Sequence, residues 1–70
     1  MHGWFKLYST KNYFEASIIK GKLEDNNIQA VMLNRQDSSY IVVGEIEIYV
    51  PLHLKDIALH LLDNSGALLN

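Results

Sequence analysis

The sequence predicts a small α+β domain with the element order β-α-β-β-α, in which an antiparallel sheet carries two helices on one face. Three patterns lead to this prediction: a capped amphipathic helix over residues 12–25, the alternating strand EIEIYVP over residues 45–51, and a second helical stripe after Pro51. The chain has 70 residues, of which 49% are hydrophobic and 20% charged. These values are typical of a single globular domain over residues 1–70.

The composition excludes several classes of protein. The chain has no cysteine, which excludes disulfides, zinc ribbons and thiol catalysis. The formal net charge of -2 offers no basic surface for nucleic acid or an anionic membrane. No apolar run approaches the ~20 residues of a membrane span, and the first residues lack the long apolar stretch of a signal peptide, so we expect a cytoplasmic protein. A domain this small buries only ~60% of its unfolded surface, which favours self-association.

Residues 4–9 alternate in character and predict the first strand, which a turn over residues 9–11 follows. One face of this strand is expected to carry Phe5 and Leu7, and the other Trp4, Lys6 and Tyr8. The first helix is predicted to begin after Asn12 as its N-cap, with Glu15 reaching back to it as in a capping box.

The buried side of the first helix is predicted from the i, i+3, i+7 spacing. Its stripe consists of Ala16, Ile19 and Leu23, widened on one side by Phe14 and Ile18. A glycine follows at position 21, where it costs about 1 kcal/mol against alanine. Either another element passes close to this glycine, or it is an exposed helix glycine.

The first helix is predicted to end at Asn26-Asn27, because asparagine adopts the left-handed C-cap conformation. The apolar run 28–33 then predicts a second strand with both faces at least partly covered. After the polar stretch 34–39, the apolar run 40–43 and the segment 45–50 predict a third strand, long and bent if Gly44 forms a bulge. One face of this strand is expected to carry Ile46, Ile48 and Val50. The other face is expected to carry Glu45, Glu47 and Tyr49.

Pro51 closes the third strand and suits the first turn of a helix. The spacing after it predicts an inward stripe of Leu54, Ile57, Ala58, Leu61 and Leu62. Gly66 is a stop signal for this helix, and residues 67–70 are either a fourth strand or a tail packed on a neighbour.

The connections select one topology. A helix joins the first two strands, which predicts a right-handed crossover, and the second and third strands form a hairpin. A split β-α-β unit satisfies both conditions by placing the third strand between the other two and antiparallel to them. The sequence therefore predicts a ferredoxin-like fold, β-α-β-β-α with an optional last strand.

The sequence also resembles a known family. The segment LYSTKNYFEASIIKGKLEDNNIQAVMLN, followed by EIEIYVP, is similar to the small bacterial DUF2007 proteins, labelled "putative prokaryotic signal-transducing proteins". The resemblance covers roughly residues 5–62 and contains no catalytic signature. The matching features are a tyrosine that closes the first strand, Phe14-Glu15-Ala16, Ile18-Ile19, Gly21 with Leu23-Glu24, the residue pair before Ile28, and the hydrophobic-Tyr-Val-Pro of the third strand.

This resemblance implies a GlnB-like fold, similar to that of the PII nitrogen regulators, and a role in signal transduction that rests on fold analogy. Leu52 and Leu54 stand where many members of the family have charged residues. The segment SSYIVVG does not match the PII modification loop, so no PII functional residue is carried over to this chain.

The best candidate site in the sequence is the loop NRQDSSY over residues 34–40. This loop concentrates polar side chains at a hairpin end, where a rigid sheet can present them to a partner or ligand: Arg35, Asp37, Ser38, Ser39 and Tyr40. Arg35 has the chemistry to hold a carboxylate or phosphate. An ordinary polar hairpin loop is the simpler interpretation.

No catalytic, cofactor or metal site is predicted. The serines lie in no nucleophile motif, and the four glycines are isolated, so the sequence has no phosphate loop. His53, Asp56 and His60 share one helix face, but the two histidines lie ~10.5 Å apart along the axis, and closed metal sites need about four ligands. Glu45 and Glu47, ~6.8 Å apart on one strand face, are interpreted as a solvated pair rather than catalytic carboxylates.

Two surfaces are predicted to support a homo-oligomer, most simply a dimer. The open sheet face would carry Trp4, Tyr8 and Tyr49, and the outer side of the second helix carries Leu52 and Leu59. Aromatic residues on such a face resemble an RNA-stacking platform, but two glutamates beside them would repel phosphate, so no nucleic acid is expected.

The sequence thus predicts a non-catalytic regulatory or interaction domain that binds an unidentified protein. The alternative is a small-ligand sensor that binds a metabolite or nucleotide where a loop meets a subunit interface. A third hypothesis is a structural domain whose relatives occur fused to larger proteins.

Overall fold

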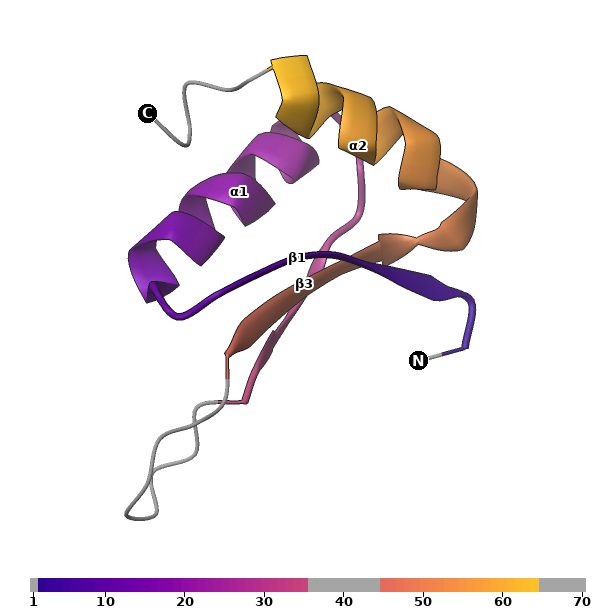
Figure 1. Cartoon of the computed structure of the whole chain (residues 1–70). Coiled ribbons are helices and arrows are strands. Elements are labelled where there is room, and N and C mark those ends of the chain that lie inside the picture. The colour runs from indigo at the N-terminus through magenta and orange to yellow at the C-terminus, as the bar shows by residue number, and fades with distance from the viewer. Residues whose placement is uncertain (1, 36–44, 65–70) are drawn as a thin grey trace, which may run out of the picture.

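The computed structural model describes residues 2–35 and 45–64 (Figure 1). Its elements are β1 (Trp4–Thr10), α1 (Tyr13–Asp25), β2 (Val31–Asn34), β3 (Ile46–Pro51), a 3₁₀ turn η1 (Leu52–Leu54) and α2 (Lys55–Asn64). The predicted strand segment 40–43, the bulge at Gly44, the stop at Gly66 and the fourth strand over 67–70 lie outside these residues.

The three strands form one antiparallel sheet with the order β1-β3-β2. Both helices lie on the same side of this sheet (Figure 1). Each helix contacts β1 and β3, and α1 also contacts β2. The predicted α+β class, with the third strand in the centre of a ferredoxin-like arrangement, is confirmed.

The start of α1 is built from local hydrogen bonds. The Oδ1 atom of Asn12 accepts the Glu15 N–H at 3.1 Å, which confirms the predicted N-cap. The second half of the predicted capping box is wrong, because Glu15 does not reach back to Asn12. Its carboxylate accepts the hydroxyls of Thr10 at 2.6 Å and Tyr8 at 3.0 Å, while the Asn12 N–H donates to Thr10 Oγ1 at 3.0 Å.

The end of α1 is a Schellman motif. Asn27 has a φ of 63°, in the left-handed region that asparagine tolerates. Its N–H donates to the Glu24 carbonyl at 3.0 Å, and the Ile28 N–H donates to the Leu23 carbonyl at 2.9 Å. Ile28 is buried with Leu23 and anchors the motif, so β2 begins only at Val31, three residues later than predicted.

The core lies between the sheet and the helices. Its fully buried large side chains come from α1 and β3: Ile19, Leu23, Ile46, Ile48 and Val50. Ala16 and Ala58 are also completely buried, which lets each helix approach the sheet closely. The predicted stripe of α1 and the predicted inward face of β3 are confirmed.

Three apolar side chains that were predicted to be buried are instead exposed. Phe14 is 74% exposed and Ile18 is 43% exposed, because both lie two positions from Ala16 and hence ~160–200° round the helix from it. Ile57 is 58% exposed, because α2 faces the core through Ala58 and the partly buried Leu61 and Leu62.

β1 is irregular at Leu7. The register runs from Lys6 opposite Tyr49 directly to Tyr8 opposite Ile48, so Leu7 is an extra residue in the strand. Leu7 and Tyr8 both pack against the core. The predicted position of Tyr8 on the open sheet face is therefore wrong, since the bulge turns this residue toward the helices.

Candidate functional site

The candidate site is the sheet face opposite the two helices, called here the open face. The pairing of Lys6 and Val31 with Tyr49, and of Ser9 and Leu33 with Glu47, places these side chains on it. Eight residues of the three strands make up the open face: Trp4, Lys6, Ser9, Val31, Leu33, Glu47, Tyr49 and Pro51. No described helix or strand covers this face (Figure 1).

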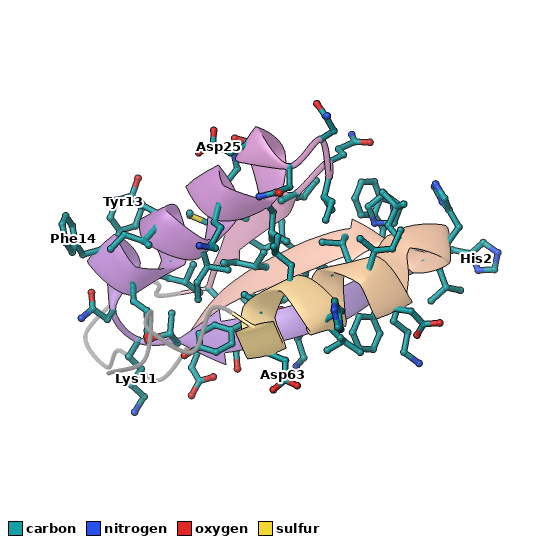
Figure 2. The ribbon with its side chains drawn as sticks, turned by 90° about the horizontal axis from the view of Figure 1, so that it is seen from above. His2, Lys11, Tyr13, Phe14, Asp25 and Asp63 are labelled. Atoms are coloured by element: carbon teal, nitrogen blue, oxygen red, sulfur yellow. The ribbon has the colours of Figure 1, made fainter. Side chains whose placement is uncertain are left out.

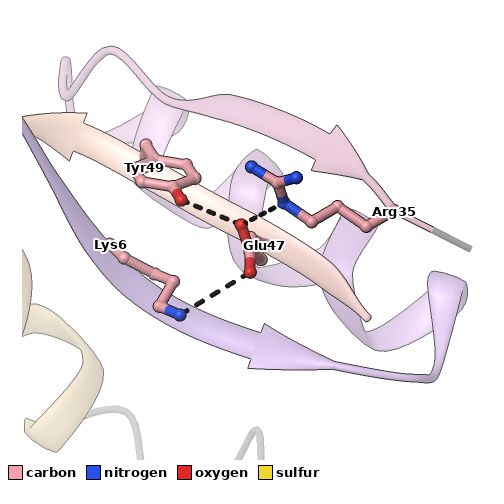
Figure 3. A network of polar contacts seen from close by, with 4 residues as sticks. All are labelled: Lys6, Arg35, Glu47 and Tyr49. Carbon is pink, nitrogen blue, oxygen red and sulfur yellow. Dashed lines mark hydrogen bonds and ion pairs between the residues drawn. The ribbon is translucent and has the colours of Figure 1, made fainter. Parts of the chain in front are cut away.

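Glu47 is the centre of a polar network on the open face (Figure 3). Its Oε1 atom accepts Arg35 Nε–H and the Tyr49 hydroxyl, each at 2.8 Å. Its Oε2 atom lies 3.6 Å from Lys6 Nζ. The Glu47 side chain is only 15% exposed, against 53% for Lys6 and 58% for Arg35. Residues from β1, from β3 and from the end of β2 thus converge on one carboxylate.

This network changes the protonation of its members. Hydrogen bonds from Arg35 and then Tyr49 lower the pKa of Glu47, and the charges of Arg35 and Lys6 add to this effect, while partial burial opposes it. The same hydrogen bond from Arg35 to Glu47 raises the pKa of the Arg35 guanidinium. Glu47 is therefore ionised at neutral pH, and its charge is compensated by side chains of the same chain.

The lowered pKa of Glu47 predicts a pH-dependent contribution to stability. Because the folded-state pKa lies below the ordinary value of about 4.5, the contribution is complete above that value and is lost as the pH falls through the folded pKa. Glu47→Gln keeps the shape but not the charge, so we expect it to be less stable than the wild type at pH ~7, by a margin that is smaller at pH ~2. Urea unfolding of both proteins at the two pH values measures this difference, and an unchanged difference would contradict the assignment.

The predicted loop site is described only at Arg35. The Arg35 N–H donates to the Glu45 carbonyl at 3.1 Å and prolongs the pairing of β2 with β3. Its side chain binds Glu47, so Arg35 belongs to the rim of the open face. Asp37, Ser38, Ser39 and Tyr40 lie outside the described residues, and their role stays a prediction.

The residues predicted for self-association are divided between three places. Trp4 and Tyr49 lie on the open face, whereas Tyr8 lies on the helix side. Leu52 in η1 and Leu59 in α2 are both exposed, as their positions outside the inward stripe predicted. Val31 and Leu33 were not predicted to lie on the open face, because a continuous apolar run does not show which alternate residues remain uncovered. Their pairing with Tyr49 and Glu47, respectively, would have indicated that they share the face of these two residues.

A surface cavity of about 550 Å³ lies between β1 and α2. It is lined by Tyr8, Asp56, Leu59, His60, Leu62 and Asp63. The Tyr8 hydroxyl is engaged by Glu15, and burial and this carboxylate raise the pKa of Tyr8. Within residues 2–35 and 45–64, no three histidine or carboxylate side chains are placed to share a metal ion. Ligand sensing at this or another site stays a prediction.

Comparison with known proteins identifies the family. A family model described as "Putative prokaryotic signal transducing protein", DUF2007, matches residues 4–66. The chain belongs to the DUF2007 family. The resemblance seen in the sequence is thereby confirmed. No curated protein and no solved structure matches this DUF2007 chain.

The family features have structural roles in this DUF2007 chain. Ala16 and Leu23 are core residues, and Glu15 binds the end of β1 through Thr10 and Tyr8. The family description names signal transduction and no catalytic activity. None of the described helices of this DUF2007 chain has the length and apolar character needed to cross a membrane.

Proposed function

We propose that this DUF2007 chain is a non-catalytic regulatory domain that acts in signal transduction by binding a protein through its open face. The observation that carries the proposal is the compensated carboxylate of Glu47 in the middle of an uncovered sheet face. The Glu47 side chain is only 15% exposed and is already paired within the chain, so a partner that covers it would leave no unpaired charge. A carboxylate that becomes covered must be paired and hydrogen-bonded to offset its desolvation.

The chemistry around Glu47 favours a protein surface as the partner. The open face supplies apolar and aromatic area through Trp4, Val31, Leu33 and Tyr49. Lys6 and Arg35 lie on either side of Glu47. Tryptophan, tyrosine and arginine are the residue types that dominate binding energy at protein interfaces. The partner is therefore expected to present an apolar patch with a polar border.

The same network argues against a catalytic role for Glu47. A general base works best with a pKa near the operating pH. The pKa of Glu47 is instead lowered, and two hydrogen-bond donors, Arg35 and Tyr49, and the ammonium group of Lys6 already contact the carboxylate. Glu47 thus holds the polar side chains of the open face in place and does not accept a proton near neutral pH.

A matched pair of aromatic substitutions tests this role. Trp4→Ala removes an aromatic side chain from the open face, and Phe14→Ala removes one from α1, where it is 74% exposed. A protein captured by the wild-type chain from a prokaryotic extract should bind Trp4→Ala at least about 30-fold more weakly, the effect of losing an aromatic interface anchor. Binding to Phe14→Ala should be unchanged, as measured by calorimetric titration of the purified partner.

A second variant guards against an indirect effect of Trp4→Ala on folding. Ser9→Arg adds bulk to the open face beside Glu47 and removes no packed side chain, because Ser9 is exposed. It should also weaken binding while its circular dichroism spectrum stays that of the wild type. A captured partner that binds all three variants with wild-type affinity would refute the open face as its binding surface.

A further inference from the structure

A groove of about 310 Å³ lies between α1 and the β2 edge of the sheet. It is lined by Tyr13, Ser17, Lys20, Gly21, Glu24 and Met32. Tyr13 lies on the side of α1 that faces away from α2 (Figure 2), and it is 61% exposed. The groove therefore opens at the margin of the domain, where α1 and β2 are its two walls.

The helical wall of this groove contains small residues. Gly21 lies one turn after Ser17, and no atom of another described element lies within 4 Å of the position that a Gly21 Cβ would occupy. Glycine weakens a helix interior relative to alanine, and no close contact within the described chain requires it here. A second backbone that approaches α1 at this point would require it.

The strand wall of the groove is an edge of the sheet. The hydrogen bond from Arg35 N–H to the Glu45 carbonyl marks a hydrogen-bonded pair of an antiparallel ladder. Alternation then directs the backbone groups of Leu33 and Val31 to β3, and those of Met32 away from it. No other described strand pairs with β2 on that side. The Met32 N–H and carbonyl therefore point outward from the free edge of the sheet, and Met32 also lines the groove.

We propose that this chain forms a two-fold symmetric dimer in which the β2 edges of two copies pair antiparallel and the two α1 helices pack across the groove over Ser17 and Gly21. An outward N–H and carbonyl on the same residue are self-complementary, as a two-fold axis requires. Pairing through Met32 also brings the α1 helix of each copy to the edge where the small residues lie.

The charge of the contact suits two identical copies. Lys20 and Glu24 form an ion pair at 2.8 Å on the wall of the groove. This wall is therefore neutral, and two copies meet there without net repulsion. A nucleic acid or a strongly charged peptide would find no complementary charge along it.

The proposed contact can be compared with the area that a dimer needs. A stable interface buries about 800 Å² per partner, roughly one sixth of the 4814 Å² that the chain exposes. In the proposed dimer this area would come from the four-residue edge of β2 and from α1 with Tyr13. The dimer goes beyond the proposed role of the open face, although it would place Val31 and Leu33 of both copies side by side on a wider face.

Two lysine substitutions on α1 test the dimer. Gly21→Lys fills the close-approach point with a long charged side chain, and Ile18→Lys adds the same side chain at an exposed position outside the groove. Sedimentation velocity over a concentration series should give a dimer for the wild type and for Ile18→Lys. The dimer dissociation constant of Gly21→Lys should be raised by about 100-fold or more, as for loss of a central interface position.

Hydrogen exchange of the Met32 amide identifies the surface directly. In the dimer this amide should exchange more slowly as protein concentration rises, and in Gly21→Lys it should not. A wild-type chain that stays monomeric at millimolar concentration would overturn the proposal. So would a dimer that Gly21→Lys leaves intact, or one in which Met32 exchange is independent of concentration. Trp4→Ala should leave the dimer unchanged, which separates this result from the test of the open face.

Discussion

Replacing Ile48 with alanine is expected to lower the free energy of unfolding by about 2–5 kcal/mol. Ile48 is completely buried on the central strand, where its side chain lies between the sheet and the helices. The substitution removes buried methylene groups and leaves a cavity that a close-packed core fills only partly. Since small domains have a total stability of only about 5–15 kcal/mol, urea unfolding followed by circular dichroism should show a large loss.

Ile57→Ala is the matched control for this prediction. It makes the same chemical change at a position that is 58% exposed on α2. We expect the free energy of unfolding to change by no more than about 0.5 kcal/mol. If Ile57→Ala were as damaging as Ile48→Ala, Ile57 would lie in the core, as its spacing in the sequence predicted.

Replacing Asn27 with valine is the second substitution with a large expected effect. The φ of 63° at Asn27 places it in the left-handed region, which costs about 1–2 kcal/mol for an ordinary side chain and is most unfavourable for a β-branched one. The Schellman hydrogen bonds of α1 depend on this conformation. We expect the melting temperature to fall by about 4–8 °C for each kcal/mol lost.

Asn27→Gly serves as the control, because it is not expected to lower the melting temperature. Glycine adopts the left-handed conformation without a steric penalty, so this variant should melt at or above the wild-type temperature in a calorimetric scan. A valine variant that melts together with the glycine variant would show that the end of α1 does not need the left-handed residue.

The elements themselves could be predicted from the sequence because their signals are local. Asn12 caps α1 through a hydrogen bond to a residue three positions away, and Asn27 ends the helix through its own backbone preference. The alternation of Ile46, Ile48 and Val50 identified the inward face of β3, which the structure buries completely. These features depend on residues that are neighbours along the chain.

The order of the strands could be predicted, but features that depend on the exact register between distant segments could not. The bulge at Leu7 exists because of how β1 aligns with β3, about forty residues later, and it moves Tyr8 to the helix side. There Tyr8 and Thr10 bind Glu15, in place of the local capping box that the spacing suggested. Exposure of Ile57 likewise followed from where α2 meets the sheet, since Ile57 is as apolar as the residues that are buried.

The candidate site was likewise predictable from the sequence only in part. Sequence alternation placed Glu47 and Tyr49 on one face, and family membership followed from the linear pattern. Only the tertiary structure brought Arg35 to the same carboxylate and set the β2 edge beside Gly21. The physical reason is that local periodicity determines which elements form and which side of each is apolar, whereas strand register determines which side chains meet. Register depends on contacts between segments that lie far apart in the sequence.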